Sequence, residues 1–378
     1  MLPRVEYIHW IQGRPERAAF DLGSSDLRDG HPEPNQVVPP ALTDVADPDP
    51  DVGLGAQVAE TYGVEESQVV VTAGASHAYV LAVAAALDAA SGDEDTDAPA
   101  SGAQLTPEGT DVVLVERPGY EPLRRVPEAM GATLHRFRRT PESGYALSPD
   151  RVAAAVEEDT ALVVATNRHN PTGRLADRET LAAAASAART AGSRLLVDEV
   201  YAPYTATARN GPFGGPTAAG LDGAVVVGSL TKFQGLGGLR IGWIVADEPF
   251  LGHVRNAFAY LPVRAAPSEA LARRAFASRE AIADRTRNRL RANHERLRTF
   301  VEGRDDVEGT VRAGSPFAFL AHESADGDAV VEAALARDLL VVPGRFFEDE
   351  DRFRVSLGGE PGEMDAALDV LGATLDAV

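Results

Sequence analysis

Five short runs of apolar residues, separated by alanine-rich stretches, constrain the fold of this chain more than any other feature. The runs occupy residues 69–71, 112–115, 161–164, 195–197 and 224–227. Each has the length and the valine and leucine content of a buried strand, and the stretches between them have helical periodicity. This alternation predicts βαβ units, and therefore an α/β fold with a large, mostly parallel sheet flanked by helices. Functional side chains are then expected at the carboxyl ends of the strands.

A smaller α/β region is predicted towards the C-terminus. Residues 268–303 are polar, rich in arginine and free of proline, which predicts one long helix. Strands are expected near residues 317–320, 340–342 and 352–356, and helices near 328–337 and 361–377. The acidic stretch 91–110, which contains proline and glycine, is predicted to be a surface loop without a site.

These patterns divide the chain into three parts. We expect an N-terminal segment, 1–44, that packs against the small domain or a partner subunit. A large domain is expected over 45–265, and a small C-terminal domain over 266–378.

Charge and composition limit the kind of partner. The sequence has 57 acidic and 36 basic residues, a formal charge of -21, which would repel nucleic acid and anionic membranes. A small-molecule substrate is expected instead. The acid excess, with arginine in place of lysine, is typical of adaptation to high salt. Cysteine is absent from the sequence, which excludes disulfides and thiolate metal ligands, and no metal is expected.

The distribution of apolar residues predicts a cytoplasmic protein. The first ten residues lack the apolar core of a signal peptide. Apolar runs stay well short of the roughly 20 residues needed to cross a bilayer, so no membrane association is expected.

Lys232 is the only lysine among the 36 basic residues. Arginine supplies positive charge everywhere else, so a retained lysine indicates a need for a primary amine, which can condense with a carbonyl to form a Schiff base. A residual surface lysine is the alternative. The neighbours favour chemistry, because Ser229 and Arg240 flank Lys232 after a predicted strand. A hydroxyl and a guanidinium beside an amine suit an aldehyde that carries a phosphate group.

Polar side chains follow two more of the predicted strands. Asp198 and Tyr201 come after strand 195–197, where a carboxylate could pair with a pyridinium nitrogen and a phenol could reach an oxygen on the same ring. An N-cap role for Asp198 is the alternative. Asn170 lies in an Asn-Pro-Thr-Gly turn and would offer its amide to the cleft, although such a sequence is often only a turn. We interpret His169 as a structural or solvent-exposed histidine rather than a base.

Small residues follow the first predicted strand, at Gly74, Ala75 and Ser76. Backbone N–H groups at such a strand-to-helix turn can hold a phosphate. One alternative is a hydrolase elbow with Ser76 as nucleophile, although Ala78 stands where that motif has its last glycine. Another is an ordinary tight turn. Neither Gly-x-Gly-x-x-Gly nor a Walker sequence occurs, so the sequence does not favour a nucleotide cofactor.

Taken together, these motifs resemble those of the fold type I pyridoxal-phosphate enzymes of the class I/II aminotransferase family, over roughly residues 35–378. The resemblance rests, in order, on residues 74–76, 118–120, 170–173, 198–201, 229–232 with Arg240, and 354–358. It implies a large sheet domain with a smaller C-terminal domain, and a homodimer. It also implies that pyridoxal 5′-phosphate is bound to Lys232 as an internal aldimine.

The resemblance implies a role for each matching residue. Asp198 would pair with the pyridine nitrogen, Asn170 and Tyr201 would contact the 3-oxygen, and Tyr120 would stack on the ring. The phosphate would be cradled by Gly74, Ala75, Ser76, Ser229 and Arg240. Arg354, with Asn170 close by, would bind the substrate carboxylate. Lys232, Asp198 and Tyr201 are the predicted catalytic residues.

The implied function is transfer of an amino group between an α-amino acid and a 2-oxo acid. A decarboxylase resembling threonine-phosphate decarboxylase, or a carbon–sulfur lyase, is the alternative on the same fold, and a serine hydrolase using Ser76 is a further one. Two family features have no counterpart here. Residues 45–50 lack the tyrosine that reaches the partner subunit's cofactor phosphate, and no second arginine marks a dicarboxylate substrate.

Overall fold

The computed structural model describes residues 2–27, 36–90, 111–208 and 210–378. The acidic stretch 91–110, for which the sequence predicts a surface loop, lies outside the described residues. Among the described residues, no helix combines the length and the apolar character needed to cross a membrane.

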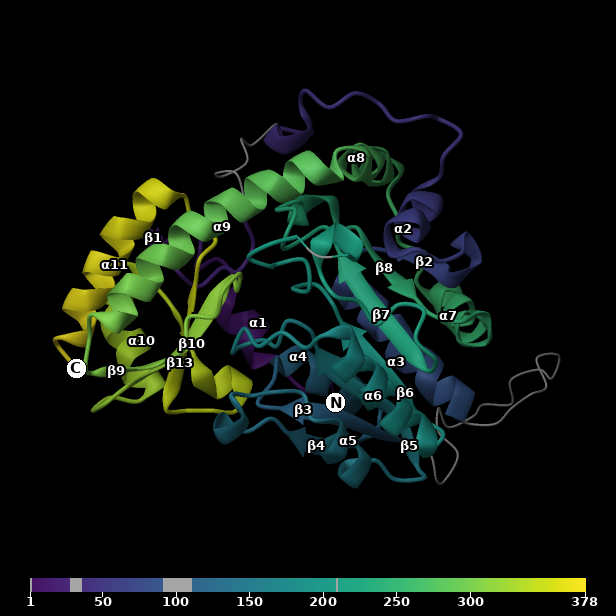
Figure 1. Ribbon diagram of the computed structural model, residues 1–378, viewed down its shortest axis with the longest axis horizontal. Helices are drawn as coiled ribbons and strands as arrows, with labels where there is room; N and C mark the ends of the chain where they lie inside the picture. The colour runs from purple at the N-terminus through teal and green to yellow at the C-terminus, as the bar shows by residue number, and fades with distance from the viewer. Residues whose placement is uncertain (1, 28–35, 91–110, 209) are drawn as a thin grey trace.

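A seven-stranded sheet forms the centre of the larger part of the molecule (Figure 1). Its strands are β2 (Val69–Thr72), β3 (Val112–Arg117), β4 (Thr133–Arg138), β5 (Thr160–Thr166), β6 (Arg194–Asp198), β7 (Ala224–Ser229) and β8 (Gly242–Val245), in the order β2-β8-β7-β6-β5-β3-β4. The strands from β3 to β7 are parallel to their neighbours, whereas β8 is antiparallel to both β2 and β7. All five predicted apolar runs form strands of this sheet, and the predicted fold class is confirmed.

Two of the seven strands were not predicted, for different reasons. The edge strand β4 has the sequence Thr-Leu-His-Arg-Phe-Arg, which buries few side chains and so lacks a clear apolar run. Strand β8 is only four residues long and begins with glycine. Strand β8 is also the element that makes the sheet mixed rather than wholly parallel.

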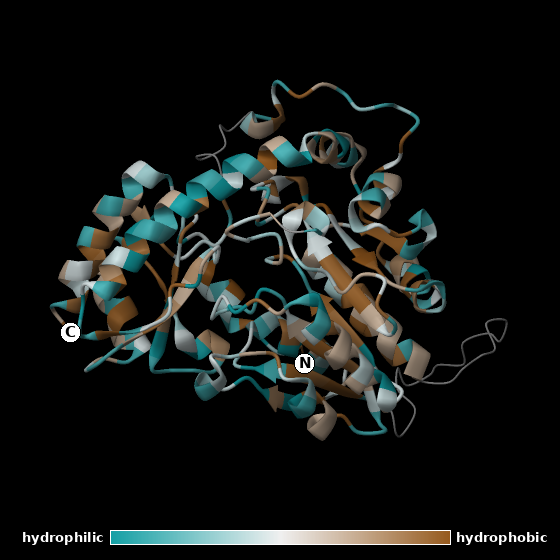
Figure 2. Ribbon diagram, viewed as in Figure 1, coloured by the Kyte–Doolittle hydropathy of each residue, from teal (hydrophilic) through white to brown (hydrophobic). Residues whose placement is uncertain are grey.

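Helices cover both faces of the large sheet, because its strands are apolar on both sides. On β3, Val113 and Val115 pack with α3 (Ala75–Ala90), α4 (Glu121–Ala129) and α7 (Glu248–Tyr260). Leu114, between them, faces the opposite cluster with α2 (Leu54–Tyr62), α5 (Pro149–Ala155) and α6 (Arg178–Thr190). This alternation follows from the two-residue period of a strand. Figure 2 shows the hydrophobic residues concentrated in these strands and hydrophilic residues along α9.

A four-stranded antiparallel sheet forms the smaller part, in the order β12 (Val342–Pro343), β13 (Arg352–Ser356), β10 (Phe317–His322) and β9 (Val307–Gly309). The helices α10 (Gly327–Leu335) and α11 (Pro361–Leu375) accompany it. Near the N-terminus, α1 (Glu6–Ile11) is followed by β1 (Phe20–Asp21), which pairs in parallel with β11 (Leu339–Leu340). The N-terminal segment therefore reaches the smaller part of the molecule.

The prediction of one long helix over 268–303 is wrong in one respect. The region forms two helices, α8 (Ala266–Ala277) and α9 (Arg279–Glu302), with a break at Ser278. Ser278 leaves the helical conformation, with φ -108° and ψ 20°, and serine has a lower helix propensity than the alanine and arginine around it. Beyond the break, α9 runs from the large sheet to the small one (Figure 1).

The central strands deliver polar residues to one edge of the large sheet. Strands β5, β6 and β7 end at Thr166, Asp198 and Ser229, and Thr166 pairs in register with Asp198. The carboxyl ends of these adjacent parallel strands therefore place the predicted site residues together, as expected for this type of sheet.

Candidate active site

Two adjoining cavities lie at the carboxyl ends of β5, β6 and β7. The smaller has a volume of about 180 Å³ and the larger about 750 Å³, and Tyr7, Tyr120 and Lys232 line both. The predicted residues that line the smaller cavity are Ala75, Ser76, Tyr120, Asn170, Asp198, Tyr201, Ser229, Lys232, Arg240 and Arg354. Gly74, the remaining one, precedes Ala75 and lies against Arg240. The structure thus brings together every site residue that the sequence predicted.

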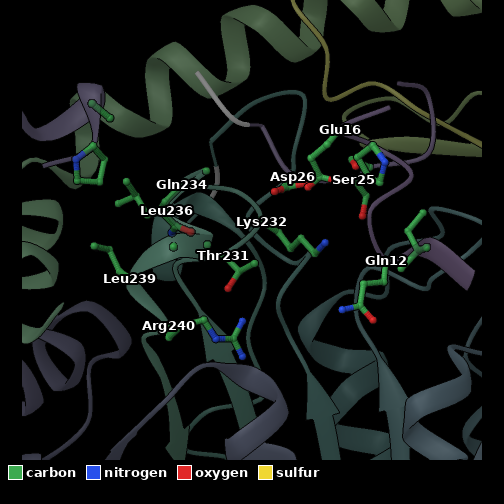
Figure 3. Close-up of a pocket in the computed structure, with 18 of the residues that line it drawn as sticks. Gln12, Glu16, Ser25, Asp26, Thr231, Lys232, Gln234, Leu236, Leu239 and Arg240 are labelled. Atoms are coloured by element: carbon green, nitrogen blue, oxygen red, sulfur yellow. The ribbon is translucent and has the colours of Figure 1, made fainter. Parts of the chain in front are cut away.

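Lys232 extends into the larger cavity from the loop after β7 (Figure 3). Its backbone carbonyl accepts a hydrogen bond from the N–H of Leu27 at 3.2 Å, which ties the loop to the N-terminal segment. Burial disfavours the charged amine, but Tyr201 and Asp26 outweigh this effect, and the pKa of Lys232 is raised above its ordinary value. The ligand-free site therefore holds a positive charge at Lys232.

The turn from β2 into α3 forms a cradle with Arg240. Gly74 has a φ of +86°, which an L side chain rarely adopts, and a Cβ there would lie 3.1 Å from the Arg240 guanidinium. The backbone N–H groups in the first turn of α3, near Ser76, have no partners within the helix. They form the positive end of the helix dipole. An arginine against a helix N-terminus forms a site suited to a phosphate group.

Asp198 supplies a carboxylate at the end of β6. Its Oδ1 accepts a hydrogen bond from the N–H of Val200 at 3.0 Å. Turns follow Asp198 rather than a helix, so it is not an N-cap. Burial raises the pKa of Asp198 to about 6, and the nearby Glu116 adds to this effect. A cationic ligand would stabilise the ionised form, so the site fits the protonated nitrogen of a pyridine ring.

Tyr201 is held from two sides. Its hydroxyl lies 2.6 Å from Ser25 Oγ, and its ring meets Phe317 edge-on with 5.0 Å between centroids. Ser25 and Tyr201 are 176 residues apart in the sequence. The N-terminal segment therefore orients a phenol that the sequence had already placed at the site.

Arg354, on β13, lines the smaller cavity and is held in place from several sides. Its Nη1 donates to Asn170 Oδ1 at 2.9 Å, and its Nη2 donates to the carbonyl oxygen of Gly23, also at 2.9 Å. Phe317 and Phe347 lie over the guanidinium, with ring centroids at 5.3 and 5.1 Å. The side chain is almost fully buried, and its Nε has no hydrogen-bond partner among the residues that the structure describes. This arrangement fixes the guanidinium and leaves it able to bind a carboxylate.

Three functional positions were missed at the sequence level, all in the N-terminal segment. Tyr7 meets the Tyr120 ring edge-on at 5.5 Å, and its hydroxyl lies 3.4 Å from Arg354 Nη2. Ser25 and Asp26 line the larger cavity beside Lys232 (Figure 3). The sequence carried no signal for these roles, because each depends on contacts with residues more than a hundred positions away.

His169 has a structural role, in agreement with one of the two roles expected from the sequence. It is fully buried, and its Nε2 lies 2.9 Å from the carbonyl oxygen of Pro118, which can only accept a hydrogen bond. Nε2 therefore carries the proton, and Nδ1 accepts from Thr172 Oγ1 at 2.7 Å. Burial lowers the pKa of His169 well below its ordinary value, so the ring is neutral. It joins the turn before Tyr120 to the turn that carries Asn170.

The geometry around Ser76 does not favour a serine hydrolase. Ser76 makes no hydrogen bond to a histidine among the described residues, and the neighbouring His77 accepts from the N–H of Ala73 through Nδ1. A triad requires such a bond between nucleophile and base. Across the described parts of the chain, no group of three or more His, Cys, Asp or Glu side chains could hold a metal ion.

Comparison with known proteins gives a consistent assignment. The family model for aminotransferase class I and II matches residues 46–371. A capreomycidine synthase from Streptomyces vinaceus is 30% identical over 274 residues, which cover 70% of this chain and 68% of that protein. A probable N-succinyldiaminopimelate aminotransferase, DapC, from Mycobacterium tuberculosis is 30% identical over 65% of this chain and 58% of its own length.

A solved structure supports the fold over the whole chain. A PLP-dependent aminotransferase from Streptococcus suis superposes with a TM-score of 0.81 at 20% identity, covering 100% of this chain and 98% of that one. The chain belongs to the aminotransferase class I and II family. The predicted fold, the pyridoxal-phosphate cofactor and the class of enzyme, a pyridoxal-phosphate-dependent aminotransferase, are thereby confirmed.

Proposed function

We propose that this enzyme transfers an amino group between an α-amino acid and a 2-oxo acid, with pyridoxal 5′-phosphate carried by Lys232. One observation carries the proposal. The only lysine of the chain lines the same cavity as a half-buried acid, Asp198, and a clamped arginine, Arg354. These three groups match the three parts of the reacting pair: the carbonyl of the cofactor, its ring nitrogen and the carboxylate of the substrate.

The remaining side chains suit the rest of the cofactor. The phosphate would be held by Gly74, Ala75, Ser76, Ser229 and Arg240. Asn170 and Tyr201 would contact the phenolic oxygen, and Tyr120 would stack on the ring. When bound, the cofactor supplies an electron sink that stabilises negative charge at the substrate α-carbon. Asp198 would keep the ring nitrogen protonated, which this role of the cofactor requires.

Arg354 and Lys232 would have different roles toward the substrate, one in binding and one in proton transfer. Arg354 would hold the α-carboxylate, leaving the Cα–H bond as the bond aligned to break. The Lys232 amine would serve as the base that takes the proton from Cα. Fixing the carboxylate in this way favours loss of the α-proton over loss of carbon dioxide, and therefore transamination over decarboxylation.

Assembly and setting are also proposals. The end of α7 and the segment after it expose Tyr260, Leu261 and Val263, with 86%, 47% and 54% of their surfaces accessible. Such an apolar patch supports a homodimer. The charge of -21 supports a cytoplasm of high salt as the setting. We further propose that residues 45–265 form the cofactor-binding domain, that 266–378 form the domain carrying Arg354, and that segment 1–44 packs against the small domain or a partner subunit.

Borohydride reduction of the holoenzyme tests the proposal directly. Reduction should fix the cofactor to the peptide that contains Lys232, as read by mass spectrometry. Lys232→Arg should keep the charge yet abolish both labelling and turnover. Ser76→Ala, the matched control, should weaken cofactor binding and leave the chemistry in place. Label found only at the α-amino terminus, or loss of activity in Ser76→Ala with Lys232→Arg still active, would rule the proposal out.

A further inference from the structure

Three neighbouring parallel strands place a buried ion pair and a hydroxyl at the border of the active site, where Thr166 lines the smaller cavity. Glu116 lies near the end of β3, Arg139 follows β4 and Thr166 ends β5. Arg139 Nη2 is 2.7 Å from Glu116 Oε2 and donates to the carbonyl oxygen of Thr166 at 3.1 Å. Glu116 Oε1 accepts from the backbone N–H of Thr166 at 2.9 Å and from its hydroxyl at 2.5 Å. All three side chains are almost fully buried.

A series of hydrogen bonds connects this pair with the substrate arginine, and each donor points from the Arg354 side towards Glu116. Because the Glu116 carboxylate can only accept, the Thr166 hydroxyl must donate to it. The same hydroxyl oxygen accepts a second hydrogen bond, from the backbone N–H of Asn170 at 3.2 Å. Asn170 Oδ1 in turn accepts from Arg354 Nη1 at 2.9 Å. Since a guanidinium can only donate, this bond fixes which end of the Asn170 amide faces Arg354.

The pair costs free energy to bury, which indicates a role beyond stability. Burial raises the pKa of Glu116, and the Arg139 charge and the two Thr166 donors only partly offset this effect. Buried ion pairs generally contribute little net stability, and well-packed apolar residues often replace them without loss. Three buried polar residues at the carboxyl ends of three adjacent strands are therefore better explained by the side chains that they orient.

We propose that Thr166, held by the Glu116–Arg139 pair, is a positioning residue for substrate binding: its hydroxyl sets Asn170, and Asn170 sets Arg354. This inference rests on the proposed role of Arg354 in binding a carboxylate. In the described parts of the chain, no hydrogen bond or ion pair joins Glu116, Arg139 or Thr166 to Lys232. Their effect should therefore appear in carboxylate affinity rather than in the rate of the chemical step.

Thr166→Val tests the proposal, because valine has nearly the shape of threonine but no hydroxyl. We expect the dissociation constant of the holoenzyme for propionate, a carboxylate without an amine, to rise about five- to tenfold, the range for one lost buried hydrogen bond. KM for an amino donor should rise by a similar factor, with kcat within about threefold of the parent. Thr166→Ser, which keeps the hydroxyl, should restore both values.

Thr160→Val is the matched control. Thr160 is the first residue of β5, at the opposite end of the strand from Thr166. It is buried and accepts a hydrogen bond from the Glu157 N–H at 2.9 Å. It should leave the propionate constant unchanged. Glu116→Gln provides a second route if Thr166→Val fails to fold. It removes the charge of the pair at constant shape and should weaken propionate binding in the same way.

The outcomes separate this inference from the proposed function. Unchanged propionate binding in Thr166→Val or Glu116→Gln, failure of Thr166→Ser to restore binding, or an equal loss in Thr160→Val would each overturn it. If the parent enzyme transaminated no amino acid, the proposed function would fail. The propionate titration, followed through the absorption of the bound cofactor, would still test the positioning role.

Discussion

We expect the ionised side chain of Asp198 to lower the free energy of unfolding of the apoprotein. Replacing it with a neutral side chain should therefore raise that free energy. Its pKa is raised from an ordinary value of 3.8 to about 6, mainly by burial. A raised carboxyl pKa means that the folded chain favours the protonated form. Protonation of Asp198 therefore stabilises the folded chain fully below about pH 4, and this stabilisation is lost as the pH rises through about 6. The shift of about two pKa units corresponds to about 3 kcal/mol at pH 8.

Asp198→Asn should therefore stabilise the apoprotein at pH 8 by up to about 3 kcal/mol and have little effect at pH 4. Asparagine keeps the acceptor for the Val200 N–H, so the local turn is retained. With cofactor bound the sign should reverse, because a protonated ring nitrogen would lose its partner. Cofactor affinity and turnover should both fall sharply.

Denaturant unfolding of the two apoproteins, at one protein concentration and in high salt, measures this difference. The parent and Asp198→Asn should differ most at pH 8 and converge as the pH approaches 4. Glu158→Gln, a change at an exposed carboxylate, is the control and should show no such trend. If Asp198→Asn destabilised the apoprotein at pH 8, or the difference did not depend on pH, the buried-charge explanation would be refuted.

The other predictions concern the two arginines and assembly. Arg354→Lys should lower kcat/KM for every amino donor about a hundredfold or more, from the 3–5 kcal/mol typical of losing one partner of a buried charge pair, without changing the cofactor spectrum. Cofactor release from this variant would contradict its role. Arg240→Lys should do the opposite, weakening cofactor binding first, as equilibrium dialysis would show. Sedimentation in multimolar salt should find a homodimer, and a fully active monomer would exclude it.

The sequence predicted the large sheet well because its signal is local. Each of the five apolar runs is buried on both faces, so its composition alone identifies a strand. The edge strand β4 and the short antiparallel strand β8 carry no such signal, since their pairing partners determine them. The break at Ser278 was also missed, because one serine in an arginine-rich stretch does not predict the end of a helix.

The site residues that could be predicted from the sequence are mainly those at or just after the ends of the predicted strands. Asp198 and Ser229 end β6 and β7, and Lys232 was evident as the only lysine. Arg354 could be assigned only through the family resemblance, since its partner Asn170 is 184 residues away. Tyr7 and Ser25 had no local signal, because long-range contacts alone bring them to the cavity. The domain boundaries remain predictions.

The fate of the amino group in a single turnover tests the central claim most directly. The holoenzyme, in excess over an isotopically labelled amino acid donor, is quenched and the products are counted. Transamination predicts one equivalent of 2-oxo acid per equivalent of donor consumed. The labelled amino group should stay with the protein-bound cofactor until a 2-oxo acid is added, and no carbon dioxide should form. Release of carbon dioxide, or of free ammonia with no amino group retained, would contradict the assignment and favour a decarboxylase or a lyase on the same fold.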